Sequence, residues 1–121
     1  MHKKTPLVYS CSGCSNVAQM ANDIALWLNK QDKAEMSCIA GIGGGVKALL
    51  HKAKNRQRIV LDGCPLQCAK SCMENQELNI DLHIDLSDFG LKKAYNTQFS
   101  EEEKLRVIND FILKKIDQLS L

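Results

Sequence analysis

The chain has 121 residues, of which 45% are hydrophobic and 25% are charged, and its formal net charge at pH 7 is only +2. This balance is typical of a folded globular domain and disfavours a disordered chain or a fibrous repeat. The length suits a single domain over residues 1–121. The small net charge argues against nucleic acid or a membrane surface as a partner.

Cysteine usage predicts a cytoplasmic protein. Six of the 121 residues are cysteines, a smaller share than the roughly 8–10% of a disulfide-stapled secreted domain. The apolar run at residues 7–9 is much shorter than the run of about 7–15 residues in an export signal. No segment approaches the roughly 18 apolar residues of a membrane span. In a reducing compartment, clustered cysteines more often bind metal or carry out redox chemistry.

The first half of the chain alternates predicted strands and helices. Apolar residues at helical spacing follow a short apolar strand, and Ser15 or Asn16 is a suitable N-cap between them. A second strand leads into the glycine-rich loop 41–45, and a second helix follows it. The predicted elements are a strand over 7–10, a helix over 17–28, a strand over 34–40 and a helix over 46–53.

The second half continues the alternation. Pro65 suits the first turn of a helix because its missing N–H group would be unpaired there in any case. Ser100 and Glu103 form a capping box, and an apolar stripe follows them. The predicted elements are a strand over 58–61, a helix over 65–77, a strand over 78–86, a loop over 91–99 and a last helix whose stripe is Leu105, Ile108, Ile112, Ile116 and Leu119.

The alternation predicts a three-layer α/β fold. Short right-handed crossovers place helices on both faces of a mostly parallel sheet of about four strands. A flavodoxin-like or Rossmann-like arrangement, with the first strand in a central position, is the simplest topology.

The cysteines fall at corresponding places in this topology. Cys11, Cys38 and Cys64 lie at the carboxyl ends of the first three strands, which meet at one edge of a parallel sheet. Cys14 and Cys68 open the helices that follow, so five thiols face one crevice, and Cys72 lies one helical turn further away. Four thiolates in a tetrahedron bind zinc, so the metal ion is the expected partner.

The cysteine motifs also resemble those of a known family. Residues 62–70, which begin Asp-Gly-Cys, together with residues 11–13, 38–44 and 90–93, are similar to the DGC-domain family, and the resemblance covers nearly the whole chain. It implies zinc binding through four cysteines and implies no reaction. The four positions that match are Cys11, Cys38, Cys64 and Cys68. Cys14 is the first alternative ligand, and Cys72 is an additional cysteine.

Two other thiol chemistries remain open. Cys11 and Cys14 have the spacing of a thiol–disulfide or thiol-transfer pair, placed at a helix start that lowers thiol pKa values. No proline-bearing loop completes such a site. Four cysteines also hold iron–sulfur clusters, although the usual ferredoxin spacings are absent.

The remaining motifs favour structural roles. The glycines of residues 41–45 match no phosphate-binding motif, and we expect them to let the backbone pass close to the thiolates. His2 and His83 are not expected to be ligands, and His83 is expected on a strand face away from the cysteines. Lys92 and Lys93 are expected in a surface loop. An exposed part of the last helix's stripe could form a homodimer face.

Overall fold

The computed structural model describes residues 5–119, so His2 lies outside the described residues. Four parallel strands form one sheet in the order β2-β1-β3-β4, which confirms a parallel sheet with the first strand inside it. The strands are β1 (Leu7–Ser10), β2 (Glu35–Met36), β3 (Arg58–Asp62) and β4 (Leu82–Asp85).

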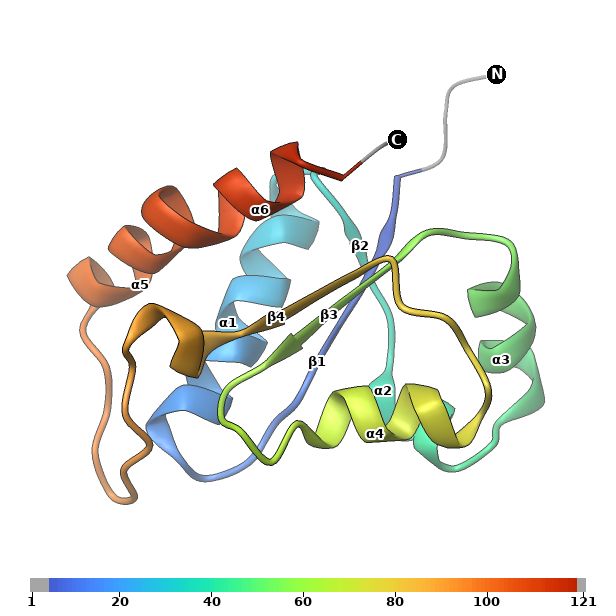
Figure 1. Ribbon diagram of the computed structural model, residues 1–121, viewed down its shortest axis with the longest axis horizontal. Helices are drawn as coiled ribbons and strands as arrows, with labels where there is room; N and C mark the ends of the chain where they lie inside the picture. The colour runs from blue at the N-terminus through green and yellow to red at the C-terminus, as the bar shows by residue number, and fades with distance from the viewer. Residues whose placement is uncertain (1–4, 120–121) are drawn as a thin grey trace.

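Helices cover both faces of this sheet (Figure 1). Alternate residues of β1 and β3 point to opposite faces, so Val8 and Leu61 belong to one core while Tyr9 and Val60 belong to the other. This confirms the three-layer α/β fold. One face carries α1 (Asn16–Lys30), α5 (Glu101–Val107) and α6 (Leu113–Asp117), and the other carries α2 (Ile39–Gly43), α3 (Lys47–Lys54) and α4 (Cys68–Asn75).

Residues 41–43 of the glycine-rich segment belong to a short helix rather than to the predicted loop. β2 ends at Met36, and α2 begins directly after Cys38. The glycines allow α2 to pack closely on α3 and α4. A Cβ atom on Gly41 would lie 2.0 Å from Cδ1 of Leu49, and a Cβ atom on Gly43 would lie 2.9 Å from Sγ of Cys72.

The structure also corrects the element boundaries around α4. This helix begins at Cys68 rather than Pro65, because Gln67 has a left-handed backbone with φ of 54°. It ends at Asn75, and the chain turns at Glu77, where φ is again positive at 56°. Residues 78–81 therefore precede β4 instead of belonging to it, and a 3₁₀ helix, η1 (Leu86–Phe89), follows β4.

The last helical segment contains a π turn that shifts its buried face. The predicted capping box of Ser100 and Glu103 is present. Between α5 and α6 lies the π turn η2 (Ile108–Ile112), which changes the rotation per residue. Val107 is therefore buried, while Leu105, expected in the apolar stripe, is 45% exposed. None of the helices within residues 5–119 has both the length and the apolar character needed to cross a membrane.

Candidate functional site

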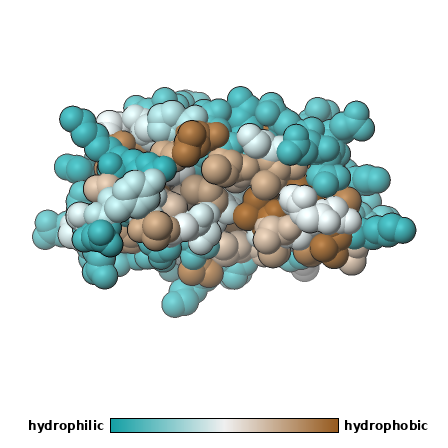
Figure 2. Space-filling view, turned by 90° about the horizontal axis from the view of Figure 1, so that it is seen from below, coloured by the Kyte–Doolittle hydropathy of each residue, from teal (hydrophilic) through white to brown (hydrophobic). Residues whose placement is uncertain are grey.

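Four cysteines line one pocket of about 220 Å³ at the carboxyl ends of β1 and β3. Cys11 follows β1 directly and Cys14 precedes α1, whereas Cys64 and Cys68 come from the segment that joins β3 to α4. The lower face in Figure 2 shows hydrophobic residues across its middle and hydrophilic residues around its rim. The wall of the pocket also includes Asp62, Leu66, Gln67, Lys93 and Tyr95.

The other two cysteines do not line this pocket. Cys38 is exposed and is the N-cap residue of α2, beyond the end of β2. Cys72 lies one turn along α4 from Cys68 and is packed toward Gly43 of α2. The structure thus brings Cys14 together with Cys11, Cys64 and Cys68 in one pocket, and leaves Cys38, which the family pattern includes, outside it.

The thiols are near one another without forming a closed chelate. Among residues 5–119, no three side chains of His, Cys, Asp or Glu are grouped so that they could hold a metal ion as they stand. Cys14 and Cys68 are exposed, while Cys11 and Cys64 are half-buried. Thiolates are ligands that suit a soft metal ion.

Asp62 connects the tip of β3 to the start of α4. Its buried carboxylate accepts hydrogen bonds from the backbone N–H groups of Ala69 at 2.9 Å and Lys70 at 3.1 Å. These N–H groups belong to the first turn of α4, where they have no partner within the helix. Asp62 therefore caps the helix from outside and fixes Cys68, the first residue of α4.

His83 contacts the same carboxylate, although it does not line the thiol pocket. Its Nε2 atom lies 2.8 Å from Oδ2 of Asp62. His83 pairs with Val60 in the register of β3 and β4, so its side chain lies on the face that also carries Asp62, two residues further along. The sequence could not show this contact, because the contact depends on strand register.

Gly63 is required by a close approach of two backbone segments. A Cβ atom at this position would lie 2.5 Å from the carbonyl oxygen of Val17 in α1. The Gly63 N–H group donates a hydrogen bond to Sγ of Cys11 over 3.2 Å. The Asp-Gly-Cys motif thus combines a helix cap, a backbone contact with a neighbouring thiol, and Cys64 itself.

Gln67 fixes the segment between Cys64 and Cys68 on its other side. Its Nε2 atom donates to Oδ2 of Asp85 at the end of β4, over 3.0 Å. Burial tends to raise the pKa of Asp85, but hydrogen bonds from Ser87 and Gln67 outweigh burial and hold this pKa below its usual value. Carboxylates at the ends of β3 and β4 therefore hold the chain on both sides of Cys68.

The electrostatics of the pocket keep Cys11 protonated. Burial raises the pKa of the Cys11 thiol to about 11, and Asp62, Cys64 and Cys68 add to the increase, while the Gly63 N–H group opposes it. The pKa of the Cys72 thiol is also raised, again chiefly by burial. At neutral pH, Cys11 is therefore a thiol that needs a strong Lewis acid to displace its proton.

Lys93 brings a positive charge to the pocket. Its Nζ atom lies 5.2 Å from the centre of the Tyr95 ring. Its pKa is raised by interaction with Tyr95 and by the nearby Cys64 and Cys68. Lys93 is the one cationic side chain among the described residues that line the pocket, so the predicted surface loop reaches the thiols.

Comparison with known proteins assigns the family. The model of the DGC domain matches residues 7–111. The anaerobic and virulence modulator AnvM of Pseudomonas aeruginosa is 52% identical to this chain over 103 residues, which cover 84% of the chain and 79% of the relative. No solved structure matches the chain significantly. The chain belongs to the DGC domain family.

Proposed function

We propose that this chain is a cytoplasmic zinc-binding protein whose thiolates hold one metal ion at the carboxyl edge of the sheet. The ligands are Cys11, Cys14, Cys64 and Cys68. The observation that carries the proposal is that these four cysteines, from two segments about 50 residues apart, line a single pocket. Four protein thiolates around zinc form a closed site rather than one with an open position for substrate.

The surroundings of the pocket support metal binding. Asp62, Gly63 and Gln67 hold the segment that carries Cys64 and Cys68, and such support orients ligands in metal sites. Zinc lowers the pKa of a coordinated thiol, so it can ionise Cys11 at neutral pH. A metal ion here would link the β1–α1 loop to the β3–α4 segment and add its binding energy to the folded state.

A regulatory role fits this chemistry better than thiol–disulfide exchange. The relative from Pseudomonas aeruginosa is named a modulator, and we extend that role to this chain. An exchange enzyme that uses Cys11 and Cys14 needs a thiolate at neutral pH. Because the pKa of Cys11 is raised to about 11, this residue is poorly suited to act as that nucleophile.

Elemental analysis tests the proposal. The untagged chain is purified anaerobically without chelators, and its zinc, iron and sulfide contents are measured with its free thiols. We expect about one zinc per chain, since a four-thiolate site holds one ion. Cys64→Ser should lose the metal. Cys38→Ser is the matched control. Because Cys38 lies outside the pocket, this variant should keep its zinc.

Three results would contradict the proposal. Iron with matching sulfide would indicate an iron–sulfur cluster. Absence of metal together with two missing free thiols would indicate a disulfide pair. Loss of zinc from Cys38→Ser with retention in Cys14→Ser would restore the ligand set of the family pattern.

A further inference from the structure

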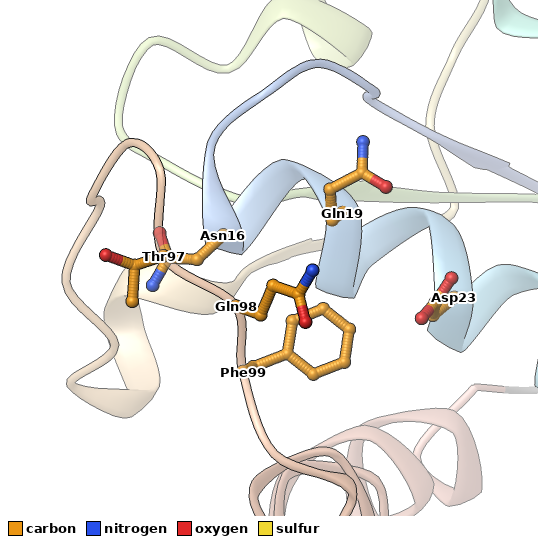
Figure 3. Close-up of a pocket in the computed structure, with 6 residues that line it drawn as sticks. All are labelled: Asn16, Gln19, Asp23, Thr97, Gln98 and Phe99. Carbon is orange, nitrogen blue, oxygen red and sulfur yellow. The ribbon is translucent and has the colours of Figure 1, made fainter.

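A second pocket has a volume of about 310 Å³ (Figure 3). Its volume is within the range of sites that bind small molecules. Its walls come from α1 and from the segment that leads to α5. The residues that line it are Asn16, Gln19, Asp23, Thr97, Gln98 and Phe99.

The hydrogen bonds around this pocket leave several acceptors free. The Asn16 amide is engaged at both ends, because its nitrogen donates to the Lys92 carbonyl over 3.1 Å and its oxygen accepts from Ala94 N–H over 2.7 Å. Gln19 donates its amide to the Gly13 carbonyl, which leaves its own oxygen available. The Thr97 hydroxyl donates to the Tyr95 carbonyl over 3.3 Å and can still accept.

The charge of the pocket is negative. Asp23 is half-buried, and its carboxylate has no hydrogen-bond or ion-pair partner within residues 5–119. Asp23 also lines a neighbouring hollow together with Lys30 and Lys104, but neither lysine forms an ion pair with it, and Lys104 is paired with Glu101 at 2.7 Å. A ligand that supplies donors and a positive charge would therefore meet acceptors that lack partners.

One wall of the pocket is aromatic. Figure 3 shows the Phe99 ring beside Gln98 and turned toward α1, where Gln19 and Asp23 lie on successive turns. An aromatic face attracts cations, so the ring and the Asp23 carboxylate favour the same kind of ligand. We propose that this pocket binds a small organic cation bearing an amine or guanidinium group, with Asp23 as its ion-pair partner and Phe99 as its stacking surface.

The two pockets share structural elements. The Gln19 amide holds Gly13, and the Asn16 side chain holds residues 92 and 94, while Gly13 and Lys93 line the thiol pocket. The segment 92–99 therefore borders both pockets. We expect a ligand between α1 and Phe99 to change the environment of Gly13 and Lys93 without touching them. Binding of the cation does not depend on the proposed zinc site.

An NMR titration of the reduced, metal-free chain with agmatine tests the inference. We expect saturable shifts of the amides of residues 16–23 and 97–99, with a Kd below about 1 mM, and smaller shifts at Gly13 and Lys93. Asp23→Asn keeps the shape of the side chain and removes its charge, so it should weaken binding at least about tenfold. Phe99→Leu should weaken binding by about two- to fivefold.

The controls separate a specific site from general attraction. Asp32→Asn removes the same charge from an exposed position after α1 and should leave the affinity within about twofold. Succinate should give no saturable shifts. The inference is overturned if agmatine does not saturate, if both Asp variants weaken binding equally, or if succinate binds as well as agmatine. Binding without any shift at Gly13 and Lys93 would overturn the coupling between the pockets.

Discussion

At the scale of single residues, Asp62 joins β3, β4 and α4 beside the thiol pocket. Its buried carboxylate serves two helix N–H groups and His83. Asp62→Ala would leave these buried groups without a partner, so the free energy of unfolding should fall by about 2–3 kcal/mol in urea denaturation. Asp88→Asn, at an exposed carboxyl, should change it by less than about 0.5 kcal/mol. Equal effects of the two variants would contradict the capping role.

The raised pKa of Cys11 predicts slow alkylation in the folded, metal-free chain. The pKa of Cys11 is about 11, against a reference value of 9.0. At pH 8, Cys11 should therefore react with iodoacetamide about 100-fold more slowly in the folded chain than in the chain unfolded in urea. Because burial favours the neutral thiol, protonated Cys11 stabilises the folded state. This stabilisation is complete below pH 9 and is lost as the pH rises toward 11. Site-resolved mass spectrometry measures the rate, and equal rates folded and unfolded would contradict the prediction.

At the scale of elements, the π turn decides which residues of the last helical segment hold the core. Ile112 is completely buried, whereas Leu105 is 45% exposed. Ile112→Ala should therefore lower the free energy of unfolding by about 2–5 kcal/mol, and Leu105→Ala by less than about 0.5 kcal/mol. Thermal or urea unfolding of the two variants measures this difference. A loss at Leu105 as large as that at Ile112 would instead support the straight apolar stripe predicted from the sequence, which contains both residues.

The same segment shows where sequence patterns stop being informative. The capping box at Ser100 was predictable because it depends on two residues three positions apart. The π turn was not, because a change of helical register leaves no local signal. The start of α4 was misplaced for a similar reason: Pro65 favours a helix start, but the left-handed backbone at Gln67, beside a hydrogen bond to Asp85, delays the helix until Cys68.

The candidate site divides in the same way. Cys11 and Cys64 could be placed together because parallel strands end at one edge of a sheet. The contact of His83 with Asp62 depends on strand register, and the position of Cys38 depends on where the short strand β2 ends. Both are tertiary properties, and the second removed Cys38 from the residues that line the thiol pocket.

At the scale of the whole molecule, the proposed metal would join two halves of the chain that the sheet already brings together. Cys11 and Cys14 follow β1, and Cys64 and Cys68 follow β3, so zinc bound by all four would stabilise the folded state only. At a free zinc concentration 100 times the Kd, the gain is about 2.7 kcal/mol, which corresponds to a rise in Tm on the order of 10 °C or more.

Thermal unfolding of cysteine variants separates this arrangement from the family pattern. Cys38→Ser should keep the full zinc-dependent rise in Tm, because Cys38 caps α2 outside the pocket. Cys14→Ser should lose much of the zinc-dependent rise in Tm, and Cys64→Ser should lose nearly all of it. A chelator should reverse the rise in the wild-type chain. Full retention of the rise in Cys14→Ser with loss in Cys38→Ser would mean that α2 moves to bring Cys38 to the metal. In that case the metal would reorganise the packing of α2 on α4, where Gly43 now meets Cys72.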